Sequence, residues 1–117
     1  MKRLVLLSFV LLFGVIGQAQ EKKDLKLNGD VIEAKLYHDS GELAQTGNYT
    51  TDGKLEGKWI SYDRTGSVTA VAYYDNGDKV GTWTFYQGDL IKEVSYMDSK
   101  IAKVENKEVQ NGRIVVN

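Results

Sequence analysis

The sequence predicts an all-β protein, a single-layer or curved antiparallel sheet made of consecutive β-hairpins. Three observations support this prediction. The chain has 12 Gly and no Pro, and glycine allows the positive φ angles of tight turns. Turn-forming pairs such as Asn76-Gly77 recur about every eight to twelve residues, which is the spacing of successive hairpins. Beyond residue 19, no stretch repeats apolar residues at the i, i+3, i+4 and i+7 positions of a helix.

Residues 1–19 have the three parts of a secretory signal peptide, so we expect a signal-peptide helix ahead of the sheet. Lys2 and Arg3 form the positive start, residues 4–16 are an uncharged apolar run, and residues 17–19 supply small residues before a cleavage site. The run is shorter than the roughly 20 apolar residues that span a membrane, and an uncleaved anchor is the alternative. The exported form would be periplasmic or secreted, without disulfides because the chain has no Cys.

The exported chain divides into three predicted segments: an N-terminal linker at 20–30, hairpin repeats at 31–104, and a capping hairpin or tail at 105–117. Each predicted strand is a short segment rich in β-branched and aromatic residues between two turns. These strands lie at 31–37, 42–49, 58–62, 67–74, 82–86, 89–96, 101–104 and 113–116.

A repeated motif, Gly-x-Trp-x-x-Tyr, occurs at residues 57–62 and again at 81–86. By strand parity, Tyr49, Tyr74 and Tyr96 occupy equivalent positions, and so do Leu43, Val68 and Leu90. A repeat of this length indicates that each hairpin is too small to bury its apolar side alone and packs against its neighbours. Glycine recurs because each crossover turns sharply.

The repeated segments resemble MORN repeats, and in particular the degenerate MORN-variant repeats of small bacterial proteins, some of which are described as antitoxin-like. The resemblance rests on GKWISYDRTGSVTAVAYYDNGDKVG at 57–81 and GTWTFYQGDLIKEVSYMDSK at 81–100, with an eroded unit at 36–57. It implies a MORN-like sheet of hairpins. Ser99 departs from the pattern, because the preceding units have Gly53 and Gly77 at that position. Beyond Ile101 the repeated Trp and Tyr residues no longer occur.

The sequence indicates no catalytic, cofactor or metal site. His38 is the only histidine, and it lies beside Asp39 in a predicted turn, where we expect it to be exposed. A general base would need a partner and a cleft, and a metal site would need further ligands. Residues 53–59 lack the spacing of a phosphate-binding loop, and the acidic turn at 74–79 lacks the ligand pattern of a calcium loop. We therefore predict a protein that is not an enzyme and takes no cofactor.

The candidate binding surface consists of the four repeated aromatic residues Trp59, Tyr62, Trp83 and Tyr86. Within each motif the Trp and the Tyr have opposite parity on their strand, so one of the two faces outward unless both faces of the sheet are covered. Exposed aromatic rows bind peptides, sugars or partner sheets. In the alternative interpretation, all four pack between layers.

We therefore expect an exported, non-enzymatic repeat domain that acts as a protein-interaction or scaffold module for an unidentified protein partner. The alternatives are a small-ligand or glycan-binding β domain and, from the resemblance alone, an antitoxin-like protein. Without Lys2 and Arg3 the chain has 13 basic and 16 acidic residues, so neither nucleic acid nor a membrane surface is an expected partner after cleavage. An open sheet leaves unpaired edge strands, which leaves an edge-to-edge homodimer open.

Overall fold

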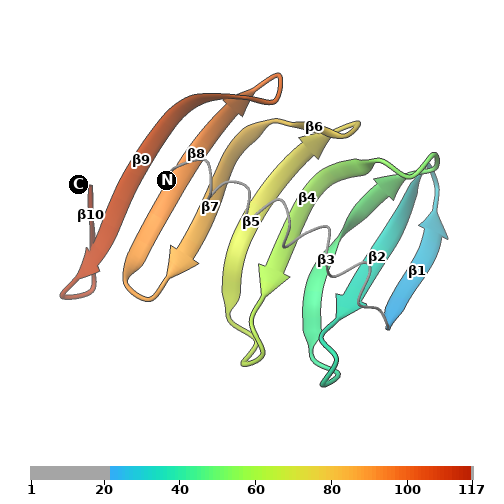
Figure 1. Ribbon diagram of the computed structural model, residues 1–117, viewed down its shortest axis with the longest axis horizontal. Coiled ribbons are helices and arrows are strands. Elements are labelled where there is room, and N and C mark those ends of the chain that lie inside the picture. The colour runs from blue at the N-terminus through green and yellow to red at the C-terminus, as the bar shows by residue number, and fades with distance from the viewer. Residues whose placement is uncertain (1–21, 117) are drawn as a thin grey trace.

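The computed structural model describes residues 22–116, which form one antiparallel sheet of hairpins (Figure 1). Strands that follow each other in the chain lie side by side in the order β1-β2-β3-β4-β5-β7-β8-β9-β10, and the short β6 pairs with β5. Their bounds are β1 Lys23–Asn28, β2 Val31–Tyr37, β3 Leu43–Thr50, β4 Leu55–Tyr62, β5 Val68–Asp75, β6 Asp78–Lys79, β7 Gly81–Gln87, β8 Leu90–Met97, β9 Lys100–Gln110 and β10 Arg113–Val116.

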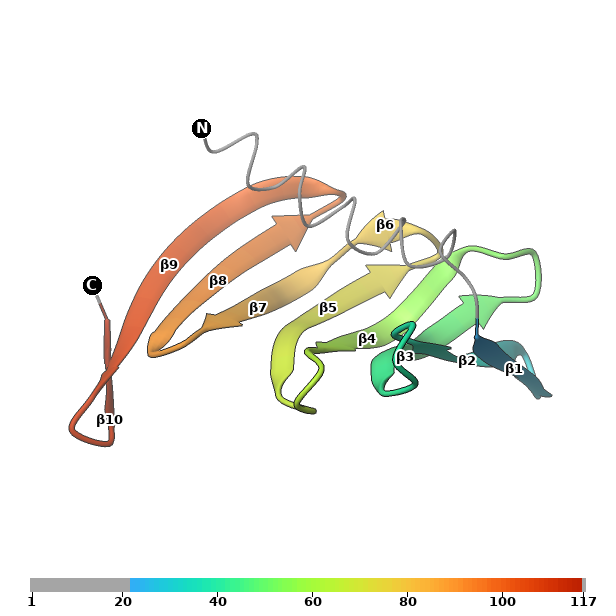
Figure 2. The same ribbon diagram turned by 60° about the horizontal axis from the view of Figure 1, so that its bottom comes forward.

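The predicted fold class is confirmed for the described residues: they contain no helix, and the sheet of consecutive hairpins does not close on itself. Figure 2 shows one layer of strands that bends along its length. The predicted signal peptide at 1–19 and its helix lie outside the described residues.

Two segments differ from the predicted strands. Residues 23–28, predicted as part of a linker, form β1 and pair with β2 along their whole length. Lys, Asp and Asn have low strand propensity, so this segment had no strand signal of its own, and the edge of β2 provides the pairing. β9 continues to Gln110 instead of ending at residue 104, because it follows β8 over its full length. Its last residues pair with β10 in a C-terminal hairpin.

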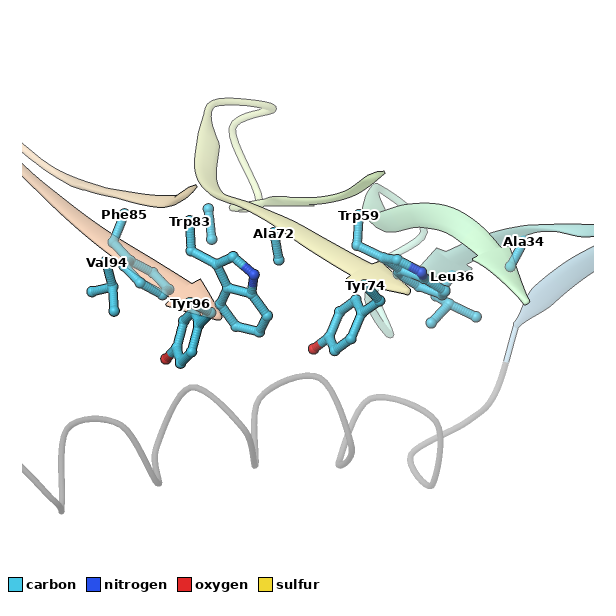
Figure 3. Packing of buried hydrophobic residues seen from close by; sticks show 10 residues of the cluster. Ala34, Leu36, Trp59, Ala72, Tyr74, Trp83, Phe85, Val94 and Tyr96 are labelled. Atoms are coloured by element: carbon cyan, nitrogen blue, oxygen red, sulfur yellow. The ribbon is translucent and has the colours of Figure 1, made fainter. Parts of the chain in front are cut away.

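The core lies on one face of the sheet, which we call the core face, and the opposite side is the outer face. Side chains alternate along each strand, and the register aligns Trp59 with Ala72, and Trp83 with Val94. Figure 3 shows the labelled core side chains on the same side of the strands. The buried residues of this cluster are Ala34, Leu36, Trp59, Ala70, Ala72, Tyr74, Trp83, Phe85, Val94 and Tyr96.

The two copies of the motif make the same contacts. The indole N–H of Trp59 donates to the carbonyl of Asn48 at 2.9 Å, and that of Trp83 donates to the carbonyl of Tyr73 at 3.0 Å. Each Trp ring meets the ring of a repeated tyrosine edge-on, with centroids 5.0 Å apart for Tyr49 and Trp59 and 5.1 Å apart for Tyr74 and Trp83. The repeat in the sequence is therefore a repeat of packing.

Positive φ angles account for the repeated glycine of the motif. Gly57 has φ of 72° and Gly81 has φ of 70°, a conformation that residues with a Cβ rarely adopt. Before each glycine the chain pairs with the neighbouring hairpin in one register, and after it the register has shifted. β6 and β7 together are therefore the counterpart of the continuous strand β4.

The hairpins also differ from one another. The β2–β3 and β4–β5 pairs each contain a bulge, beside Tyr37 and Tyr62, whereas β7 and β8 pair without a register shift. Because of this, Leu43 and Val68 face Tyr37 and Tyr62, but Tyr86 faces Ile91. The predicted equivalence of Leu90 with Leu43 and Val68 is thus wrong by one residue, since a bulge adds a residue that periodicity alone does not reveal.

Candidate functional site

The structure divides the four predicted surface residues between the two faces of the sheet. Trp59 and Trp83 are each 1% exposed and belong to the core. Tyr62 and Tyr86 have the opposite parity and lie on the outer face. Tyr86 is 41% exposed, and Tyr62 is half-buried. The parity argument is therefore confirmed, but the four residues do not form a common surface, because the two Trp side chains pack inside the protein.

A third tyrosine joins the two on the outer face. Tyr37 ends β2 as Tyr62 ends β4, and Tyr86 lies one residue before the end of β7. Alternate strands of a sheet are about 9.6 Å apart, so the backbones of the three tyrosines are regularly spaced across the sheet. We call this line of residues the tyrosine row. Tyr37 was not among the predicted residues, although its position 25 residues before Tyr62 was a signal for it.

An aliphatic side chain lies opposite each ring of the tyrosine row. Leu43, Val68 and Ile91 are the cross-strand partners of the three tyrosines in turn, and directly opposite residues share a face of the sheet. All three aliphatic residues retain contact with solvent. The outer face therefore presents an aromatic and aliphatic strip that crosses the sheet beside one set of hairpin turns.

Polar contacts connect the first unit of this strip to β1 and to the second unit. The hydroxyl of Tyr37 donates to Asp24 Oδ2 at 2.9 Å, and this hydrogen bond raises the pKa of Tyr37. Arg64 and Asp39, in the turns of neighbouring hairpins, form an ion pair of 2.9 Å. Both of its side chains are well exposed, so it contributes to orientation more than to stability.

His38 has a structural role in the same region. Predicted as an exposed turn residue, it is instead half-buried, and its Nε2 lies 3.0 Å from the carbonyl oxygen of Tyr62. A carbonyl can only accept, so Nε2 carries the proton and donates. This bond ties the turn after β2 to the end of β4, which fixes the position of one ring of the row.

The turn after Tyr62 is also well ordered by hydrogen bonds. Asp63 Oδ1 accepts from the backbone N–H of Thr65 at 2.9 Å and from that of Ser67 at 3.0 Å, as well as from the Thr65 hydroxyl at 2.6 Å. These bonds, with the Thr65 hydroxyl contributing most, lower the pKa of Asp63. Its carboxylate is thus occupied by its own turn.

One buried polar pair lies on the core face. Gln45 is fully buried, and its Nε2 donates to Ser61 Oγ at 3.3 Å, while its Oε1 has no hydrogen-bond partner. In the next unit the register pairs Ala70 with Phe85 at the corresponding place. The first unit therefore has a buried polar pair at the place where the second unit has an apolar pair.

Beside Tyr37, an open hollow is lined by Lys22, Lys23, Asp24, Tyr37 and Gly41. Acidic and histidine side chains are otherwise dispersed: within residues 22–116 no three of them gather as a metal site would require. Among the same residues there is no helix of the length and apolar character needed to cross a membrane.

Comparison with known proteins adds no relative. No protein-family model matches the chain, and no curated protein or solved structure is significantly similar to it.

Proposed function

We propose that the protein is an exported, non-enzymatic MORN-like repeat domain that binds a protein partner along the tyrosine row of its outer face. The observation that carries this proposal is the recurrence of Tyr37, Tyr62 and Tyr86 at the same end of alternate strands, each beside an aliphatic residue. Tyrosine offers a large amphipathic contact area with few rotatable bonds, and it is enriched at protein interfaces.

The surroundings of the row support an interface of the usual kind. Specific interfaces have an apolar centre and a polar rim. Here the aromatic and aliphatic strip is bordered by Asp24, the Arg64–Asp39 ion pair and the partly buried Lys107–Glu93 pair, whose charged atoms are 3.0 Å apart. Because the tyrosines of the row lie on paired strands, the surface is already ordered before a partner binds, and less entropy is lost on binding.

Affinity capture from the cell-envelope fraction tests this proposal. The variant Tyr62→Ala/Tyr86→Ala removes two rings of the row, and we expect it to lose the proteins that the wild type retains. Lys58→Ala/Lys103→Ala is the matched control, because both lysines lie on the outer face away from the row. Identical captured proteins for the wild type and the tyrosine variant, with both chains folded, would refute the proposal.

A second candidate, glycan binding, is favoured by the hollow beside Tyr37. Convergent charged groups next to an aromatic ring are typical of small polar ligand sites, and here Lys22, Lys23 and Asp24 line the hollow together with Tyr37. A glycan that binds there should raise the melting temperature of the wild type but not that of Tyr37→Ala. If Tyr37→Ala retains glycan binding, this candidate fails.

Export is the remaining part of the proposal, and it rests on the sequence of residues 1–19. We expect the mature chain to begin at Gln20. Mass spectrometry of the protein recovered from the cytoplasm, the periplasm and the medium measures its N-terminus directly. A chain that keeps residue 1 and stays in the cytoplasm would contradict this.

A further inference from the structure

The two edges of the open sheet have different chemistry. β1 has the sequence KDLKLN, in which half of the residues are charged, while β10 has the sequence RIVV. Natural proteins protect free edges with charged residues, especially Lys. β10 instead exposes β-branched apolar residues, with Ile114 62% and Val116 56% exposed. A terminal hairpin that caps a repeat stack is normally polar on its outer side, so β10 is a poor cap.

We infer that β10 pairs antiparallel with β10 of a second copy of this chain, so that the sheet continues across a two-fold axis. This goes beyond the proposed function, because it concerns an edge of the sheet and not its outer face. The backbone groups of β10 that point outward determine how a second copy can pair with it.

The contacts of β9 identify those groups. The N–H of Val109 donates to the carbonyl of Asp89 at 2.8 Å, on the side of β9 away from β10. Val109 and Ile114 are therefore a non-hydrogen-bonded pair of the β9–β10 ladder. Hydrogen-bonded and non-hydrogen-bonded pairs alternate in an antiparallel ladder. The N–H and C=O groups of Ile114 and Val116 thus point to the outer edge, while those of Val115 point to β9.

Only one symmetric register uses all of these outward groups. Ile114 of each copy must lie opposite Val116 of the other, which sets Val115 opposite its own copy on the two-fold axis. Each Ile114–Val116 pair then exchanges two backbone hydrogen bonds, and β-branched side chains meet across the strands, a favourable pairing. Arg113, the one charged residue of β10, ends up at opposite ends of the two-stranded ribbon, so no like charges meet.

A second copy in this arrangement gives a closed dimer. Pairing of β10 with β1 of another copy would be heterologous, and it would continue into an open filament unless the rotation between copies closed a ring. It would also place Lys23 and Lys26 of β1 beside the apolar β10 edge. The β10–β10 pairing avoids both, because the two identical edges satisfy each other.

Single-cysteine crosslinking tests the register, since the chain has no Cys of its own. The substitutions are made in the full chain, which is purified after processing by the host. Val115→Cys should give a disulfide-linked dimer under mild oxidation, because the two thiols face each other at a non-hydrogen-bonded pair, where the strands are closest. Ile114→Cys, which lies opposite Val116, should crosslink far less. Leu25→Cys on β1 is the control, because its crosslinking would show that the β1 edge is the one that pairs.

Sedimentation of Val116→Pro provides an independent test. Proline removes the outward N–H and is tolerated on edge strands, so the variant should stay folded while the dissociation constant of the dimer rises about tenfold or more. Leu27→Pro at the β1 edge should leave the dimer unchanged. A monomeric wild type, or crosslinking through Leu25→Cys with none through Val115→Cys, would overturn the inference, whatever the outcome of the affinity capture.

Discussion

Gly47 lies directly beneath the indole ring of Trp59. A Cβ at position 47 would come within 2.1 Å of a ring carbon. Gly47→Ala should therefore lower the free energy of unfolding by about 1–3 kcal/mol, the usual cost of overpacking a core. Urea denaturation measures the loss. In a Trp59→Leu background the same substitution should cost much less, and an equal cost in both backgrounds would show that the ring is not the cause.

Lys79 replaces an aliphatic residue of the repeat. Ser99 N–H donates to the carbonyl of Lys79 as Gly77 N–H donates to that of Leu55, so the two residues are counterparts. Leu55 packs against the core, whereas the Lys79 Nζ lies 5.3 Å from the ring centroids of both Trp83 and Tyr96. Burial lowers the pKa of Lys79.

Substitutions of Lys79 separate its packing from its charge. Lys79→Ala should cost about 1 kcal/mol or more, because it loses the side-chain stem and a cation–π contact. Lys79→Leu, which copies the first unit, should cost less, because the apolar stem is retained. Chemical denaturation of both variants at neutral pH measures the difference, and an equal loss in the two would mean that packing is not what Lys79 contributes.

Three tyrosines on the core face should make the folded protein less stable at alkaline pH. Burial raises the pKa of Tyr49, Tyr74 and Tyr96 in the folded protein, with a further contribution from Tyr96 at Tyr74. A raised pKa means that the folded state keeps its protons longer, so the stabilisation is complete below the unfolded value of about 10 and is lost as the pH rises above it.

The alkaline loss should be smaller in Tyr74→Phe. Comparing urea denaturation at neutral pH and above pH 10 measures this loss for the wild type and the variant. Lys79, whose pKa is lowered, acts in the opposite direction over the same range, so the Lys79→Leu variant should lose more stability in alkali than the wild type. A wild type whose stability does not change above pH 10 would contradict the burial of these tyrosines.

At the scale of strands, the sequence was informative where turn chemistry and apolar alternation agree. All eight predicted strands are present, because pairs such as Asn76-Gly77 and Asn111-Gly112 form turns with positive φ at both positions. β1 was missed because its Lys, Asp and Asn residues favour no strand. The end of β9 was missed for the same reason, since pairing with β8 determines it.

The strands should differ in local stability. β1 and β10 contribute no buried residue, whereas the core cluster spans β2 to β8. Backbone amides in strands without buried contacts open more readily. Hydrogen exchange should therefore be slowest in β4, β5 and β7 and fastest in β1, with β10 protected only if its edge is paired. Uniform protection across the sheet would argue against a core confined to the middle strands.

For the whole molecule, the repeat and its packing could be predicted, but the candidate site only in part. Parity placed one aromatic of each motif on each face without saying which. The indole N–H of each Trp donates a hydrogen bond to a carbonyl of the neighbouring strand. This contact places the Trp on the core face. The motif does not predict Tyr37 as a surface residue, because the unit of Tyr37 lacks the Trp. The tyrosine nevertheless occupies the same place on the outer face.

The most direct test of this division between the faces is the stability of two neighbouring variants, Trp83→Ala and Tyr86→Ala, measured by urea denaturation. Trp83 is buried and Tyr86 is exposed. Trp83→Ala should therefore lower the free energy of unfolding by about 3–5 kcal/mol, whereas Tyr86→Ala, which loses only its cross-strand contact with Ile91, should lower it by about 1 kcal/mol or less. Equal losses in the two variants, or a larger loss for Tyr86→Ala, would contradict a sheet that buries its tryptophans and offers its tyrosines to a partner.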